Sequence, residues 1–97
     1  MVETSIGKPY EDYVGTDYFL RVFYPNIEEA ELIWHRDKTD REIEVVSGVG
    51  WQLQMDDELP FELEEGQIYN IKKEEYHRLI KGKGTLRIKI RETENEI

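Results

Sequence analysis

Both histidines of this chain lie in short polar runs that are far apart in the sequence. His35 belongs to a charged run, residues 34–41, which also holds Asp37 and Arg41, whereas His77 stands in a second run downstream. An imidazole can act as an acid, a base or a metal ligand near neutral pH. The residue types therefore suggest a catalytic pair of histidines, provided that the surrounding elements bring the two runs together.

Short segments with a two-residue period surround these runs and predict strands. Charged and apolar residues alternate over residues 41–46 and again over 85–91, as expected for half-buried strands. Further strands are expected at residues 17–24, 32–35, 51–55, 61–64, 68–71 and 76–80. Residues 47–50 contain two glycines and predict a turn that joins 41–46 to 51–55 as a hairpin. About seven or eight short strands without a convincing helix predict an all-β sandwich or barrel.

Length and composition indicate one small globular domain. The 97 residues predict a single domain over 1–97, with an N-terminal arm at 1–15 and a polar tail at 92–97. The absence of cysteine excludes disulfides and thiolate zinc sites, and fits a reducing compartment. The 22 acidic and 13 basic residues give a formal charge of −9, which argues against nucleic acid and membranes as partners. No signal peptide and no apolar run of roughly 18 residues is visible, so a cytoplasmic protein is expected.

The spacing of glycines and histidines resembles the two motifs of the cupin superfamily. The second cupin motif is glycine, five residues, proline, one residue, glycine, two residues and histidine. Gly66 and His77 have this separation, while Lys72 and Glu74 occupy the proline and second glycine positions. The resemblance extends over about residues 19–90 and implies a cupin-like jelly-roll β-barrel, also called a double-stranded β-helix.

The first cupin motif is histidine, one residue, histidine, three or four residues, glutamate, six residues and glycine. His35 and Gly48 have the correct separation, while Asp37 takes the second histidine position and Arg41 the glutamate position. The chain looks like the very short single-domain cupins of unassigned function, of which tailed phages carry examples.

The resemblance also implies a metal site. Cupins that bind metal hold Fe, Mn, Ni or Zn with three histidines and a glutamate, and this chain offers His35, Asp37 and His77 instead. Two imidazoles and one carboxylate form the facial triad of non-haem Fe(II) sites, which leaves positions open for substrate or dioxygen. His35 and Asp37 are two residues apart, so on a strand they would point to the same side.

Arg41 complicates this site, because the motif alignment and the strand period place it on the same inner face. A fixed cation there would oppose a divalent ion. Arg41 could instead clamp both carboxylate oxygens of Asp37, or bind the carboxylate or phosphate of a ligand. In a further alternative, His35, Asp37, Arg41 and His77 form a buried polar network without metal.

Two functions remain open from the sequence. The first is a cupin that binds a small molecule or serves as a structural barrel, with a degenerate metal site and no catalysis. The second is a metal-dependent enzyme that acts on a small polar or anionic substrate through His35, Asp37 and His77, with Arg41 as the anion anchor. Small jelly rolls often pair to cover exposed sheet edges, so a homodimer is also one expectation.

Overall fold

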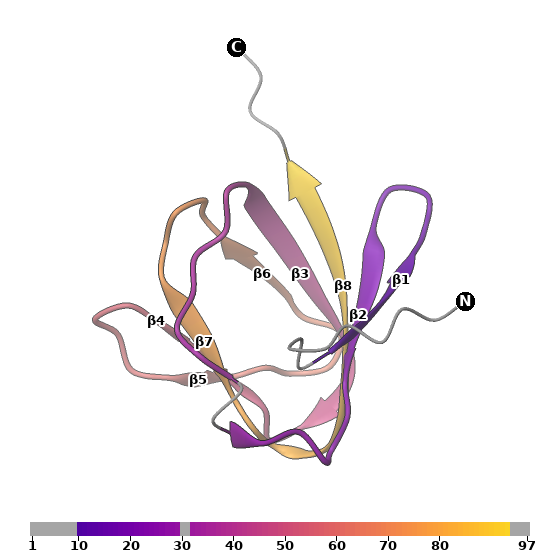
Figure 1. Ribbon diagram of the computed structural model, residues 1–97, viewed down its shortest axis with the longest axis vertical. Coiled ribbons are helices and arrows are strands. Elements are labelled where there is room, and N and C mark those ends of the chain that lie inside the picture. Colours follow the sequence, from indigo (N-terminus) through magenta and orange to yellow (C-terminus); the bar gives the residue numbers. More distant parts are fainter. Residues whose placement is uncertain (1–9, 30–31, 94–97) are drawn as a thin grey trace.

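Eight strands make up most of the computed structural model, which describes residues 10–29 and 32–93 (Figure 1). In chain order they are β1 (Glu11–Val14), β2 (Phe19–Phe23), β3 (Asp40–Val49), β4 (Gln52–Met55), β5 (Phe61–Glu62), β6 (Ile68–Ile71), β7 (His77–Ile80) and β8 (Lys83–Thr93). The described residues form no α-helix, which confirms the all-β prediction. Consequently, no helix within residues 10–29 and 32–93 is long and apolar enough to cross a membrane.

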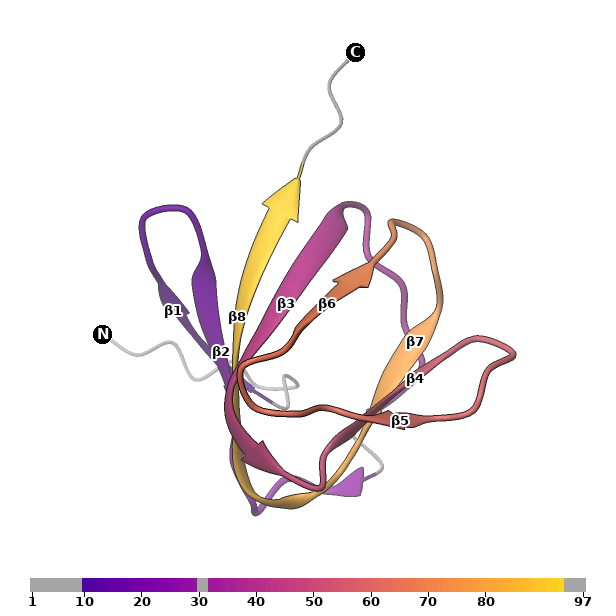
Figure 2. The same cartoon turned by 180° about the vertical axis from the view of Figure 1, so that it is seen from behind.

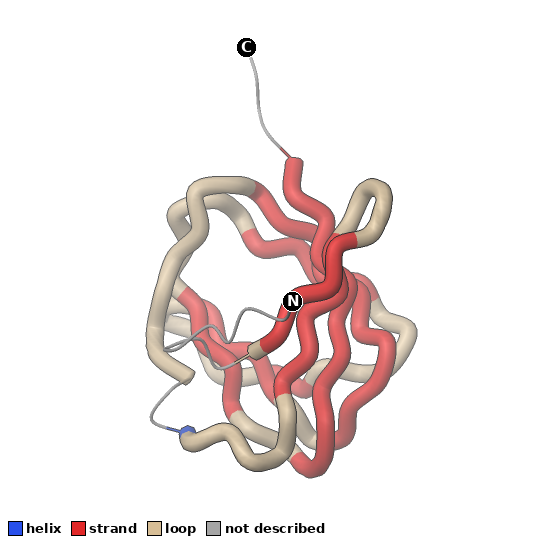
Figure 3. The backbone as a smooth tube through the Cα atoms, turned by 45° about the vertical axis from the view of Figure 1, so that its right-hand side comes forward, coloured by secondary structure: helices blue, strands red, loops and turns tan. Residues whose placement is uncertain are grey.

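The strands form two antiparallel sheets that face each other (Figures 1 and 2). The larger sheet has the order β1-β2-β8-β3-β6, and the smaller has the order β5-β4-β7. Apart from β1 and β2, neighbours in the larger sheet are not consecutive in the sequence, and β8 lies between β2 and β3. Loops join the strands at both ends of the barrel (Figure 3). This arrangement is the expected jelly roll.

Alternate residues of both sheets fill the space between them with apolar side chains. The buried core comprises Phe23, Ile27, Ile43, Val45, Trp51, Leu53, Met55, Leu63, Ile71, Leu86, Ile88 and Ile90. Residues between these positions face outward, and Arg91 of β8 contacts Glu42 and Glu44 of β3 at 3.3 and 3.2 Å. The alternation seen in the sequence is therefore the division between core and surface.

The expected hairpin between residues 41–46 and 51–55 is wrong, because the chain changes sheet there. β3 continues to Val49 and pairs with β6 and β8, whereas β4 pairs with β5 and β7. Gly50 has a φ of 73°, which permits the corner, and Trp51 beyond it is fully buried. Alternation predicts each strand but carries no information about its partner.

Other expected boundaries also shift. The strand expected at residues 32–35 is reduced to a single bridge at His35, and the one at 61–64 to the two residues of β5. Residues 11–14 of the expected arm form the edge strand β1, and β8 runs to Thr93, inside the expected polar tail. The remainder of the arm up to residue 9, and residues 94–97, lie outside the described residues.

Candidate metal centre

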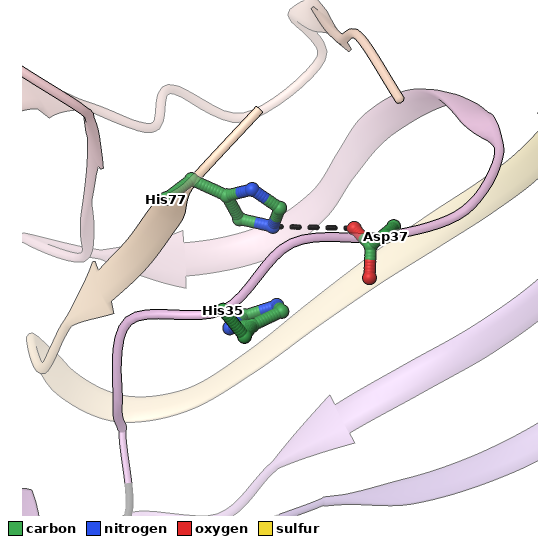
Figure 4. Close-up of side chains that lie close together, drawn as sticks. All are labelled: His35, Asp37 and His77. Carbon is green, nitrogen blue, oxygen red and sulfur yellow. Dashed lines mark ion pairs between the residues drawn. The ribbon is translucent and has the colours of Figure 1, made fainter. Parts of the chain in front are cut away.

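His35 and His77 face each other across an isolated antiparallel bridge beside β7. The backbone N–H of His35 donates to the carbonyl of His77 at 3.0 Å, and the N–H of His77 donates back at 2.9 Å. Residues paired in this way project their side chains to the same face. The two imidazoles accordingly make an edge contact, with ring centroids 4.3 Å apart (Figure 4).

Two cation–π contacts flank this bridge. The guanidinium of Arg78 lies 4.9 Å from the ring of Trp34, and that of Arg36 lies 5.2 Å from the ring of Tyr76. Successive side chains of an extended segment alternate in direction, so these four residues lie on the face opposite the histidines. Each such contact contributes about 0.5–1 kcal/mol at an exposed position. They help to hold the His35 segment, which forms no strand, against β7.

Backbone carbonyls orient both imidazole rings. Nδ1 of His35 lies 3.0 Å from the carbonyl oxygen of Ile33, and Nδ1 of His77 lies 2.8 Å from that of Glu75. A carbonyl can only accept, so each Nδ1 carries the hydrogen and donates it. In the neutral rings, Nε2 then keeps a lone pair. A hydrogen bond donated by the ring nitrogen that does not bind the metal is the usual way in which a protein orients histidine as a metal ligand.

Asp37 completes a group of three candidate ligands. One nitrogen from each histidine and one oxygen of Asp37 all lie within 4.8 Å of one another. Oδ2 of Asp37 is 3.3 Å from Nε2 of His77, at ion-pair distance (Figure 4). This oxygen is buried, yet no described residue makes a hydrogen bond to it. A buried oxygen of this kind usually has a partner, and a divalent cation between the three residues would provide one. The residues present therefore fit a metal ion.

Arg41 lies beside this group and contacts Oδ1 of Asp37, while Oδ2 accepts no hydrogen bond from the described residues. Its Nη1 is 3.4 Å from Oδ1 of Asp37, and its Nη2 donates a hydrogen bond to Glu92 at 3.3 Å. The alternative in which Arg41 clamps both oxygens of Asp37 is therefore wrong. The contact involves Oδ1 and leaves Oδ2 facing His77. Two carboxylates also offset the positive charge of Arg41, which reduces its repulsion of a cation.

A cavity of about 270 Å³ opens next to the three candidate ligands. Apolar side chains from both sheets make up most of its wall, including Phe23, Leu53 and Ile88. Sequence reasoning missed Arg21, which also lines the cavity and stacks 3.6 Å from the ring centroid of Tyr10. The two-residue period of the strand could have identified it, because Arg21 is two residues from Phe23 and therefore lies on the same inward face.

Comparison with known proteins identifies the fold. The sequence matches no protein-family model, and no curated protein matches it significantly. Among solved structures, an RmlC-like cupin family protein with a double-stranded β-helix fold from Methanocaldococcus jannaschii is similar, with a TM-score of 0.67 and 15% identity over 96% of this chain and 86% of its own. A cupin-2 domain containing protein from Shewanella frigidimarina has a TM-score of 0.57 and 26% identity over 80% of this chain and 72% of its own. A cupin domain from Bordetella pertussis has a TM-score of 0.58 and 13% identity over 93% of this chain and all of its own, 100%.

This chain has a cupin fold. The motif positions identified in the sequence are His35 and Asp37 in the first motif and His77 in the second, and the fold of this cupin brings them together. Arg41, at the motif's glutamate position, does not join the candidate ligands but contacts one of them. The likeness to the short cupins of phages stays a prediction.

Burial and neighbouring charges shift the pKa of two groups at this site. Partial burial lowers the pKa of the His35 imidazole below its ordinary value of 6.5, although the Ile33 carbonyl opposes the shift. Burial would raise the pKa of the Asp37 carboxyl, but a hydrogen bond from His77, in the form that carries a proton on Nε2, and the charge of Arg41 outweigh it, so the pKa lies below 3.8. The preferred forms are a neutral imidazole and an ionised carboxylate, which are the forms that ligate metal.

The metal-free cupin is expected to lose stability as the pH falls below 6.5, the ordinary pKa of histidine. The folded chain binds fewer protons at His35 than the unfolded chain, so this contribution is complete above that pH and is lost as the pH falls through the lower, folded pKa. Urea unfolding across this range measures the effect, and His35→Gln should show a shallower decrease just below pH 6.5 than the wild type. If stability decreases with pH equally steeply in the variant and the wild type, His35 is not the group responsible.

Proposed function

We propose that this cupin binds a divalent transition metal (Fe, Mn, Ni or Zn) through His35, Asp37 and His77, and that it holds a small molecule in the adjoining cavity. Two imidazoles and one carboxylate suit these metals and leave coordination positions open. A bound ion would act as a Lewis acid toward the small molecule. His35 and His77 would hold the ion, while Arg41 keeps Asp37 in place.

The observation that supports this proposal best is the contact between Oδ2 of Asp37 and Nε2 of His77. The two atoms are 3.3 Å apart, and the side chains are only 10% and 5% exposed. Because Nδ1 of His77 donates to Glu75, the neutral ring turns a lone pair, not a hydrogen, toward an anionic oxygen. Two lone pairs at this distance repel each other, and an ion bound to both atoms would remove this repulsion.

A second reading places a proton on Nε2 of His77 and makes the contact a simple ion pair. A polar network would then stabilise the barrel without metal, and its members would be His35, Asp37, Arg41 and His77. This network would contribute to stability through the charge of Asp37. The two readings make opposite predictions about how an uncharged side chain at position 37 changes the stability of the metal-free protein.

Asp37→Asn is expected to weaken metal binding by roughly 100-fold or more and to stabilise the metal-free protein slightly. The amide NH₂ can donate to the lone pair of His77, while the amide oxygen still faces Arg41. One added hydrogen bond contributes about 1 kcal/mol. Tag-free protein should be titrated with Zn(II), Mn(II), Ni(II) and anaerobic Fe(II), with bound metal and the unfolding temperature as readouts.

Asp56→Asn is the matched control, because it makes the same chemical change at an exposed turn. It should bind metal as the wild type does, at about one ion per chain. If the wild type binds none of the four metals and Asp37→Asn lowers the unfolding temperature, the proton-bridged network is correct and the metal proposal is wrong.

A further inference from the structure

We infer that the ligand of this cavity is a small apolar molecule with a single negative charge, such as an aromatic monocarboxylate, and that it binds only when the metal is present. The inference rests on the proposed metal site and adds the chemical class of the molecule that enters beside it. Three observations carry it: the size of the cavity, its lining, and the balance of charges around it.

The size and lining of the cavity set the body of the ligand. A dry cavity of about 150 Å³ holds a benzene ring, so 270 Å³ has room for roughly ten non-hydrogen atoms. Side chains such as Phe23, Ile43, Leu79 and Ile90 form the greater part of the wall. A sugar or other polyol would leave its hydroxyl groups without partners against this wall, at a cost for each unpaired group. An aromatic ring or a short branched chain fits it.

The charges around the cavity set the charge of the ligand. The wall and its ion-pair partners carry two positive charges, at Arg21 and Arg41, and three negative charges, at Asp12, Asp37 and Glu92. With neutral imidazoles the net charge of these groups is −1, which repels an anion. A divalent ion changes the sum to +1, and a monoanion then brings it to zero. The metal is therefore required for anion binding.

Arg41 supplies a donor for the anionic end. Its side chain is 15% exposed and lines the cavity, and its Nε–H is buried without a hydrogen-bond partner among the described residues. By contrast, the guanidinium of Arg21 is occupied, since it donates to both carboxylate oxygens of Asp12 at 2.8 and 3.0 Å. The bound ion and Arg41 would thus face the carboxylate, while the apolar wall faces the ring.

Calorimetric titration of zinc-loaded protein tests the inference with benzoate and its uncharged counterpart benzamide. Benzoate should bind at least about tenfold more tightly than benzamide to the loaded protein, and at least about tenfold more tightly than to metal-free protein. Phthalate, a dianion of similar size, should bind more weakly than benzoate because the pair would leave a net negative charge in the cavity.

Arg41→Gln should reduce the ratio of benzoate to benzamide affinity severalfold, whereas Arg87→Gln, on the outward face of β8, should leave it unchanged. Because both affinities are measured on the same loaded protein, this ratio does not depend on how tightly zinc is held. Equal affinities for benzoate and benzamide, or equal benzoate affinities with and without zinc, would overturn the inference alone. The zinc content is measured before the titration. If the protein does not load zinc at all, both the proposed function and this inference are overturned.

Discussion

At the proposed metal site, His77→Ala is expected to lower the zinc affinity of this protein by roughly 1,000-fold. Removing a residue that only orients a ligand already costs about 10–100-fold, and His77 is itself one of three candidate ligands. His77 is 4% exposed and begins β7, so its ring is the most firmly held of the three. Zinc content after dialysis and competition with a coloured chelator measure the change.

Added imidazole provides a control for the loss of fold. The alanine leaves a ring-sized space beside Asp37, so millimolar imidazole should restore part of the zinc binding if the barrel is intact. His35→Ala should also lose zinc, although by less, because His35 lies exposed at the edge of the site. Zinc retention by His77→Ala at the wild-type stoichiometry would show that the ion binds elsewhere.

Gly82→Ala is expected to lower the free energy of unfolding by about 3 kcal/mol, which is the upper end of the usual cost of overpacking. A Cβ at this position would meet the backbone nitrogen of Trp51, the carbonyl oxygen of Val49 and the carbonyl carbon of Gly50 at less than van der Waals distance. Backbone atoms cannot rotate aside as a side chain can. The clash falls where β3 passes into β4, so relieving it would separate the two sheets.

Gly66→Ala is the matched control for this prediction. A Cβ at Gly66 would meet nothing within 4 Å, but the φ of 81° is unfavourable for alanine. The expected cost is therefore only the conformational one of about 1–2 kcal/mol. Urea unfolding of both variants compares steric with conformational cost, and a Gly82→Ala variant as stable as Gly66→Ala would mean that the corner can relax.

The sequence determined most of the strands, because their alternation records which side of each strand is buried. Residues 68–71 and 77–80 form strands as expected, and residues 41–46 and 85–91 lie inside β3 and β8. It could not determine strand partners. The hydrogen bonds of a ladder join backbone groups that every residue has, so nothing in residues 41–55 distinguishes a hairpin from the corner at Gly50.

The candidate site shows the same division. Motif spacing alone selected His35, Asp37 and His77, and the structure brings them within 4.8 Å. Spacing could not decide what Arg41 does, because the outcome depends on Glu92, which is 51 residues away in the chain and only one strand away in the fold. Whether a cation beside a carboxylate blocks a metal ion depends on which oxygen it contacts and which second anion shares its charge. Those distances depend on the pairing of β3 with β8 and on the loop before β3 that carries Asp37, and only the tertiary structure sets them.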